Sequence, residues 1–516
     1  MLIKISFLVV FVAIMVGVGL YCNRKVNDVN GFVLGGRTAG PWITAFSYGT
    51  SYFSAVIFIG YAGQFGWKYG LAATWIGIGN ALIGSLFAWS ALGRRTRVMT
   101  QHLRSKTMPD FFGTRFDSKA LKIFASVLVF VFLIPYTASL FNGLSRLFGM
   151  AFNIDYTYCV IGMAVLTGIY VVAGGYMAAA INDLIQGIIM LVGIVAVVMA
   201  VLKTQGGFTA AVEALSLIPA ENSNQAGVFT SFFGPDLFNL VGVVLLTSLG
   251  TLGLPQMIGK FYAIKDEKSI KTGTIVSTVF ALVVAGGCYF LGGFGRLFGD
   301  RVEYSADGSI IYDSIVPGML RDLPDILIAI VVILVLSASM STLSSLVLTS
   351  SSTITLDFIA PLRKKDLQEK SKLSIMRVFV AFFIIVSAVI AIIQAKSSVT
   401  FIAQLMGISW GALAGSFLAP FLLGLYWKKV TKAAVCVNFI SGAGIMILNM
   451  TAKPIFPEFL QSPLNAGVFA MLLGFVIVPV VSLLTQKTLD KNKVDEMFDC
   501  YNKDVKVKTK HILESK

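Results

Sequence analysis

The sequence FSYGTSYFSA, residues 46–55, sets Gly49 among tyrosines, serines and a threonine in the middle of an otherwise apolar segment. A membrane helix satisfies its backbone polar groups internally, and a glycine within polar residues marks a point where that helix can be interrupted. Irregular backbone at membrane depth is tolerated where it is buried in protein or lines a cavity, and transporters use it to bind ions and substrate. The stretch therefore predicts a broken helix with a binding role.

The rest of the chain has the composition of an integral membrane protein. Of 516 residues, 56% are hydrophobic and 13% charged, whereas a soluble domain has about 25% charged residues. Runs of about 17 to 25 apolar residues predict membrane-spanning helices. We count about thirteen such runs, centred near residues 12, 53, 82, 132, 164, 191, 246, 283, 338, 384, 412, 440 and 475. The predicted fold class is all-α.

A second interruption is predicted at LGTLGLPQM, residues 249–257, where two glycines and a proline fall within one span. Gly and Pro are also common in ordinary membrane helices. The two interruptions lie five spans apart, however, as an inverted repeat of five plus five helices requires. We expect a leading helix at 1–22, repeats at 41–203 and 236–426, two further helices at 431–486 and a tail at 487–516.

The charge distribution predicts the orientation. Basic residues concentrate in alternate connections, at 23–40, 94–122, 257–272, 359–377, 426–433 and 485–516. The positive-inside rule makes these segments cytoplasmic, with the N-terminus outside and a solvated C-terminal tail inside. The net charge of +15 then follows from topology, and no nucleic-acid partner is needed. The run from Ile3 to Tyr21 is alternatively a signal peptide, but its length favours a retained span.

Hydroxyl groups crowd one span at SASMSTLSS, residues 337–345. At about 100° per residue, Ala338, Ser341, Thr342 and Ser345 share one face of the helix, with Ser344 at its edge. Such hydroxyls often bond to carbonyls of their own helix or permit close packing. A dense one-sided cluster also suits a small hard cation, which prefers oxygen ligands.

Asp183, in GGYMAAAINDLIQG (174–187), is the best candidate for an acid inside the membrane. A carboxylate at that depth is costly unless it is paired, so it marks a functional site by default. Alternatively, Asn182 and Asp183 cap a helix that starts after Gly174 and Gly175. With two histidines, both in basic segments, and five scattered cysteines, we expect no enzymatic site.

Five stretches give the chain a resemblance to the sodium/solute symporter family. They are LGGRTAGPWITAFSYGTSYFSA (34–55), TMPDFFGTRF (107–116), AGGYMAAAINDLIQG (173–187), SMSTLSS (339–345) and WGALAGSFLAPFLLGLYWKK (410–429). The resemblance implies a LeuT-like fold with a leading helix, a monomeric transporter in the plasma membrane, and Na⁺ as coupling ion for a small-molecule substrate. It extends from about residue 5 to 485.

The family's sodium site implies ligands from the carbonyls of Thr50, Phe53 and Ala338 and the hydroxyls of Ser341 and Thr342. Some members bind a second sodium through an acid on the sixth span and further serines. The matching residues here are Asp183, Ser341, Ser344 and Ser345, so the resemblance favours two sodium ions.

The solute is less well determined. Tyr52 stands where the family's proline carriers have an acid, and Thr247 and Thr251 replace their aromatic pair, which disfavours proline. The arginine of sialic acid carriers aligns near 133–136, where none occurs. A small carboxylate, vitamin or amino acid is expected, with a sugar symporter or a sodium-independent facilitator as alternatives. The candidate solute ligands are Ser51, Tyr52, Ser54, Tyr136, Ser139, Thr247, Thr251 and Gln404.

Overall fold

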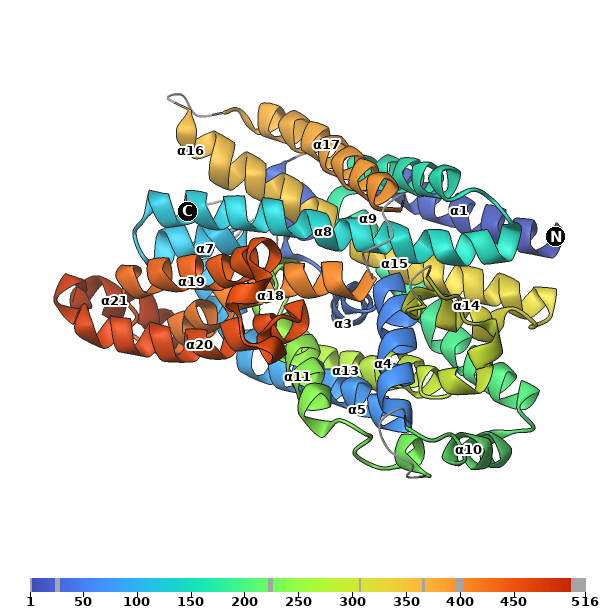
Figure 1. Cartoon of the computed structure of the whole chain (residues 1–516). Coiled ribbons are helices and arrows are strands. Elements are labelled where there is room, and N and C mark those ends of the chain that lie inside the picture. The colour runs from blue at the N-terminus through green and yellow to red at the C-terminus, as the bar shows by residue number, and fades with distance from the viewer. Residues whose placement is uncertain are drawn as a thin grey trace.

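The structure, a computed structural model, describes residues 2–23, 28–220, 226–305, 308–363, 367–395 and 402–502. Across those ranges the chain is helical and contains no β-strand (Figure 1). The helices are α1 (Leu2–Asn23), α2 (Val29–Leu34), α3 (Pro41–Tyr52), α4 (Ala62–Tyr69), α5 (Thr74–Gly79), α6 (Arg94–His102), α7 (Met108–Arg115), α8 (Lys119–Phe152), α9 (Tyr156–Thr204), α10 (Phe208–Ser216), α11 (Leu237–Ser248), α12 (Pro255–Tyr262), α13 (Glu267–Gly292), α14 (Ile315–Leu320), α15 (Asp325–Thr353), α16 (Ala360–Leu362), α17 (Glu369–Ala395), α18 (Ile402–Tyr426), α19 (Lys432–Thr451), α20 (Pro463–Leu484) and α21 (Lys491–Phe498).

Ten helices in the described ranges are long and apolar enough to cross a membrane, and the bent pair Leu237–Gly253 and Pro255–Tyr262 makes eleven. Two of the about thirteen predicted spans account for the difference. The span near residue 53 is divided by a break, and the one near 164 has a shorter apolar part, Tyr156–Ile169. The all-helical, membrane-spanning class is therefore confirmed.

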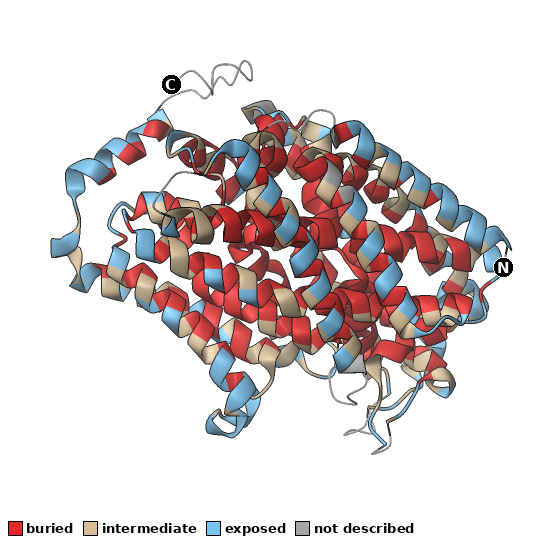
Figure 2. Ribbon diagram, turned by 90° about the horizontal axis from the view of Figure 1, so that it is seen from above, coloured by how far each residue is buried: buried red, intermediate tan, exposed pale blue. Residues whose placement is uncertain are grey.

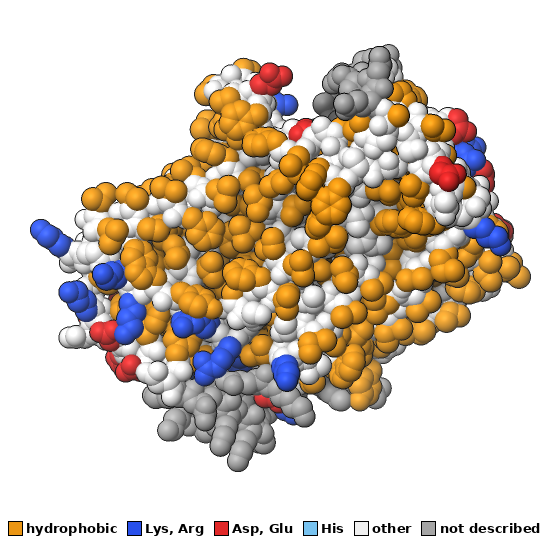
Figure 3. Space-filling model, turned by 90° about the horizontal axis from the view of Figure 1, so that it is seen from below, with side chains coloured by type: hydrophobic (Ala, Val, Ile, Leu, Met, Phe, Trp, Pro, Cys, Tyr) orange, Lys and Arg blue, Asp and Glu red, His pale blue; other side chains and the backbone are white. Residues whose placement is uncertain are grey.

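The spans are arranged around a buried centre. α15 and α18 are the most deeply buried of them, and α15 packs against α9, α8, α1, α17 and α3. Figure 2 shows buried residues along the interior of the bundle and exposed ones on its outside. The outward-facing side chains are largely apolar, and Figure 3 shows them covering the middle of one face, with most Lys and Arg toward one end. An apolar belt of this kind is what a bilayer requires.

The first predicted break exists, but it lies four residues beyond Gly49. α3 continues through Gly49 to Tyr52, and the backbone becomes extended at Phe53, with φ −97° and ψ 130°. The π-helical segment η2 (Val56–Tyr61) then leads into α4. Gly49 serves packing instead, because a Cβ there would lie 2.7 Å from Cδ1 of Phe280.

The second predicted break is confirmed. α11 tightens into the 3₁₀ turn η7 (Gly250–Gly253), Leu254 is extended, and α12 begins at Pro255 with a bend of 46°. Proline is well suited to the first turn of α12 because its missing N–H has no partner there anyway.

A third irregularity interrupts α9 at Gly175, whose φ of 56° and ψ of −148° suit glycine. Helical backbone resumes directly after it, so Asn182 and Asp183 lie well inside α9. The interpretation of these two residues as a helix cap is therefore wrong. Asn182 instead donates from Nδ2 to the carbonyl of Met15 on α1, 3.3 Å away.

Part of the tail expected to be solvated is folded against the molecule. α21 and the 3₁₀ turn that follows it, Asp499–Asn502, bury Phe498 and Cys500. Lys493 forms an ion pair with Asp117 at 2.8 Å, and the guanidinium of Arg95 lies 4.6 Å from the ring centroid of Tyr501. The remaining tail, 503–516, lies outside the described residues.

Candidate ion and solute site

The break after α3 faces the hydroxyl cluster of α15. The hydroxyl of Ser341 lies 2.9 Å from the carbonyl oxygen of Thr50 and 3.1 Å from that of Ala338. The hydroxyl of Thr342 lies 3.0 Å from the carbonyl oxygen of Phe53 and 3.1 Å from that of Ala338. The structure thus brings together all five residues predicted for the first sodium, from two segments almost 300 positions apart.

This cluster has more acceptors than donors. The hydroxyl of Thr342 also lies 3.4 Å from the carbonyl of Ser51 and 3.5 Å from that of Thr50. Two hydroxyl protons therefore face four carbonyl oxygens, three of them at the end of α3 where the next helical turn is missing. Every residue in the cluster is at most 1% exposed. A surplus of oxygen lone pairs in a dry site is the donor set that a hard monovalent cation requires.

Ser339 determines how the chain restarts after the break, and the sequence interpretation did not single it out. Its hydroxyl accepts a hydrogen bond from the backbone N–H of Ala55 at 3.2 Å. The N–H groups of Ile57 and Phe58 are satisfied by the carbonyl of Ser54. The two sides of the break thus bond to the same turn of α15, which stabilises an extended residue in the membrane interior.

Asp183 lies on α9 beside an unexpected partner. Its Oδ2 accepts a 2.6 Å hydrogen bond from Ser47 of α3 and lies 3.5 Å from the ammonium of Lys260 on α12. Lys260 also donates to the Ser47 hydroxyl at 2.8 Å. All three side chains are buried. The sequence predicts a basic cytoplasmic connection at 257–272, which includes Lys260. That prediction is wrong for Lys260, because α12 places this lysine in the protein interior.

Hydrogen bonds to both the hydroxyl and the backbone carbonyl of Ser47 lead from Asp183 toward α15. The hydroxyl of Ser51 donates to the carbonyl of Ser47 at 2.7 Å and lies 2.8 Å from the hydroxyl of Ser345. Ser344 donates to the carbonyl of Ser341 in its own helix. Asp183 keeps one carboxylate oxygen, Oδ1, without a hydrogen-bond partner in the described part of the protein. The second predicted sodium set remains a prediction.

Some of the predicted solute ligands contact one another, and others bond within their own helix. Tyr52 and Thr247 meet, since the Tyr52 hydroxyl donates to the Thr247 carbonyl at 3.2 Å, and Thr251 lies one turn further along the same broken span. Ser139 donates to the carbonyl of Tyr136 in its own helix, as in ordinary packing. Gln404 lies half-buried at the start of α18. The remaining members are Ser51, bonded to Ser345 as above, and Ser54 and Tyr136.

Two further residues join this region. The ring of Trp410 on α18 lies 6.2 Å from that of Tyr52 and 5.9 Å from that of Tyr136, and Asn80 accepts a 3.0 Å hydrogen bond from Thr247. A tryptophan in WGALAGS gives no sequence signal of its own, because aromatic residues are common in membrane helices. Four buried polar atoms here form no well-aligned hydrogen bond among the described residues: Ser54 Oγ, Tyr136 Oη, Trp410 Nε1 and Asn80 Nδ2. Unsatisfied polar groups among aromatic rings are what a polar solute can occupy.

Comparison with known proteins identifies the family of this chain. Residues 32–442 match the sodium:solute symporter family, and this range includes α3, α9, α12, α15 and α18. The chain belongs to the sodium:solute symporter family. As a member of that family it is a multi-pass membrane transporter and not an enzyme.

A curated relative of this symporter is the sodium/proline symporter of Staphylococcus aureus (strain JH9), 28% identical over 503 residues that cover 93% of this chain and 92% of the relative. Among solved structures, a Na⁺-coupled sialic acid symporter in a substrate-bound outward-open state superimposes with a TM-score of 0.74 at 16% identity, covering 93% and 98% of the two chains. Mhp1, a nucleobase-cation-symport-1 family transporter, gives 0.50 at 13% identity, with 90% and 98% covered. The predicted LeuT-like fold is confirmed.

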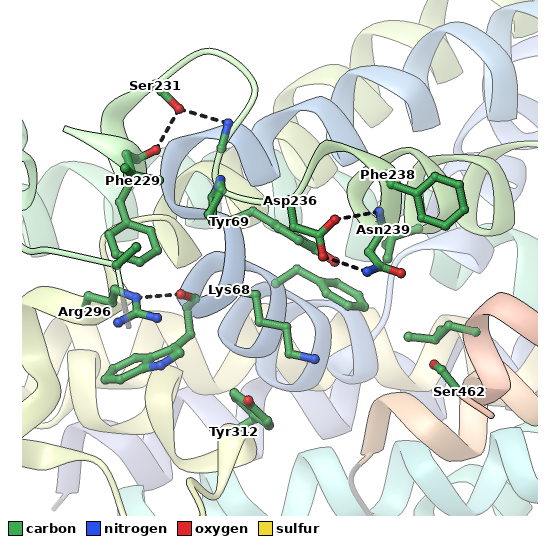
Figure 4. A pocket seen from close by; sticks show the side chains of 18 of the residues that line it. Lys68, Tyr69, Phe229, Ser231, Asp236, Phe238, Asn239, Arg296, Tyr312 and Ser462 are labelled. Carbon is green, nitrogen blue, oxygen red and sulfur yellow. Dashed lines mark hydrogen bonds between the residues drawn. The ribbon is translucent and has the colours of Figure 1, made fainter. Parts of the chain in front are cut away.

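Two of the symporter's cavities have separate linings. The larger, about 1060 Å³, is lined by α4, the segment before α11, and the loop before α20 (Figure 4). In it the ammonium of Lys68 lies 5.4 Å from the ring centroid of Tyr312, and Arg296 donates to the carbonyl of Trp67 at 2.7 Å. The smaller, about 50 Å³, is lined by Lys260 and Ser345 among others. The predicted solute ligands Tyr52, Ser54, Tyr136 and Thr247 are buried and line neither cavity.

Proposed function

We propose that this protein imports a small polar organic solute together with sodium by alternating access. The observation that carries the proposal is the set of four carbonyl oxygens facing the hydroxyls of Ser341 and Thr342 across the break after α3. An apolar or purely structural contact would have no use for more acceptors than donors at this depth. The first sodium is bound there, by Thr50, Phe53, Ala338, Ser341 and Thr342.

A second sodium is proposed at Asp183 with Ser341, Ser344 and Ser345. Supporting this are the partnerless Oδ1 of Asp183 and the hydrogen bonds that connect Ser51 to the carbonyl of Ser47 and to the hydroxyl of Ser345. The number of ions matters energetically. At 100 mV and a tenfold gradient each sodium supplies about 3.7 kcal/mol, so one ion concentrates a neutral solute about 500-fold and two about 10⁵-fold.

The proposed solute is a small carboxylate, vitamin or amino acid, held by Tyr52, Ser54, Tyr136 and Thr247. These groups supply hydroxyls and a ring wall without a fixed charge, so a solute carboxylate would have to be balanced by sodium or by a half-helix N-terminus. The named relatives carry proline or sialic acid. Tyr52, Thr247 and Thr251 still argue against proline here, because they replace the acid and the aromatic pair of the proline carriers.

The topology proposed for this function places the N-terminus outside and the C-terminus in the cytoplasm. The larger cavity then faces outward and the smaller one inward. The two inverted repeats comprise residues 41–203 and 236–426, each beginning with a broken helix. The protein is proposed to function as a monomer.

The test is uptake by purified protein in liposomes, using a panel of carboxylates, vitamins, amino acids and sugars, each with inward sodium or potassium gradients. A thermal-shift screen of the same panel finds the solute first, because a ligand that binds only the folded state raises its stability. We expect one solute to stabilise the protein and to accumulate only with sodium. Equal flux in potassium would support the facilitator instead, and Ser341→Ala should remove the sodium dependence.

A further inference from the structure

Asp183 has two competing cations in the arrangement described above. The carboxylate belongs to the proposed second sodium site, yet the ammonium of Lys260 lies 3.5 Å from its Oδ2 and bonds to the Ser47 hydroxyl that bridges them. The side chains of Asp183 and Lys260 are at most 4% exposed. One carboxylate balances one cation, so sodium and the ammonium together would leave an excess positive charge in a dry site.

The small cavity offers the ammonium a second position. Lys260, Gln256 and Thr353 all line this space of about 50 Å³, which is several times the volume that one water needs. Gln256 precedes Lys260 by four residues and so lies on the same face of α12. Gln256 Oε1 and Thr353 Oγ1 are buried acceptors without a hydrogen-bond partner in the described ranges.

Lys260 already borders the small cavity. The ammonium already lies 5.3 Å from the ring centroid of Tyr176, which also lines the cavity, and an aromatic face at that distance attracts a cation. The flexible four-carbon stem of lysine permits the ammonium to move without a shift of α12. Ser345, a proposed sodium ligand, forms part of the same wall.

We propose that Lys260 is a tethered cation that competes with the second sodium for Asp183. When sodium binds, the ammonium withdraws to Gln256 and Thr353 in the small cavity; when it returns, it displaces sodium into that cavity. Lys260 thereby weakens sodium binding at the Asp183 site and promotes release on the side that the cavity faces. This inference rests on the proposed function, since it assumes a second sodium at that site.

The test is a sodium titration of the purified full-length protein, followed by intrinsic fluorescence and by thermal unfolding, at constant ionic strength with potassium as replacement. Wild type should respond in two phases, the weaker one from the Asp183 site. Lys260→Gln should shift that phase to about tenfold lower sodium, because the competing charge is gone. Lys260→Arg should shift it severalfold higher, because a guanidinium binds a carboxylate more firmly than an ammonium does.

Lys106→Gln is the matched control, since Lys106 lines the same cavity but has no described contact with Asp183. An equal shift in Lys106→Gln and Lys260→Gln would mean that only the overall charge of the cavity matters, and would overturn the inference. So would an unchanged or weaker sodium response in Lys260→Gln together with an unchanged Lys260→Arg. If Lys260→Gln does not fold, Lys260→Arg provides the test. A shift to higher sodium supports the inference, and no shift or a shift to lower sodium overturns it. A wild-type protein that ignores sodium altogether would refute the proposed function instead.

Discussion

Replacing Thr342 by valine keeps the shape of the side chain and removes one oxygen from the proposed first sodium site. That hydroxyl lies within 3.5 Å of the carbonyls of Thr50, Ser51, Phe53 and Ala338, so it is central to the oxygen cluster. A neutral group in contact with a charge contributes about 1.5–3 kcal/mol, taking hydrogen bonds to charged groups as a guide. Sodium binding should therefore weaken by about 10- to 150-fold.

The assay follows from linkage between binding and stability. With sodium at 100 times its dissociation constant, wild type gains about 2.7 kcal/mol of unfolding free energy over potassium. If the dissociation constant of Thr342→Val rises 100-fold, the gain at the same sodium concentration falls to about 0.4 kcal/mol. Thr342→Ser restores the oxygen and should recover most of the difference. An undiminished sodium gain in Thr342→Val would show that the cation is bound elsewhere.

Three further outcomes are expected. Burial raises the pKa of Asp313 to about 6, so the folded state binds one more proton than the unfolded state between about pH 4 and 6. The free energy of unfolding therefore falls as pH rises through that window, by up to about 3 kcal/mol. Asp313→Asn should flatten this pH dependence in a thermal-unfolding series, and an unchanged slope would contradict the assignment. Gly66→Ala should prevent stable folding, because its Cβ would lie 2.0 Å from the Gly292 backbone. The control Gly259→Ala should be tolerated, because no atom lies within 4 Å of its Cβ. Size-exclusion profiles of detergent extracts compare the two variants. Lys122→Met should lower the free energy of unfolding by about 3–5 kcal/mol. The lysine bridges the carboxylates of Asp110 and Asp357 at 2.6 and 3.3 Å, and its loss leaves a buried charge uncompensated. A change of less than about 1 kcal/mol in chemical denaturation would refute this.

The sequence was sufficient for features that depend on local composition. Hydropathy located the spans, and the Gly and Pro residues of 249–257 located the bend before α12, because both signals are written in consecutive residues. The face of α15 that bears Ser341 and Thr342 followed from helical periodicity alone. The family's ligand positions were then brought together by the fold without exception at the first site.

Features that depend on distant partners could not be predicted in the same way. The break after α3 falls at Phe53 and not at Gly49, because Ser339 and Thr342 of α15 provide the partners for the freed backbone groups. Lys260 looked like one more basic residue of a cytoplasmic connection, since its carboxylate partner lies 77 positions earlier in the chain. Phe498 in the tail has the same explanation: its apolar contacts come from other segments.

The oxygens of the proposed first sodium site come from two helices, the end of α3 and the middle of α15, and neither helix has a complete set. A bound ion is therefore a removable cross-link between them. While it is in place, the two segments are held at a fixed separation, and the extended residue Phe53 is clamped against its neighbour. Once it leaves, only the hydroxyls of Ser341 and Thr342 still bond to the carbonyls at the end of α3, and the joint between α3 and the π-helical η2 loses one of its restraints. Ion occupancy would then determine whether that joint is rigid or free to bend, so an ion in the membrane interior would control how α3 is oriented relative to α15.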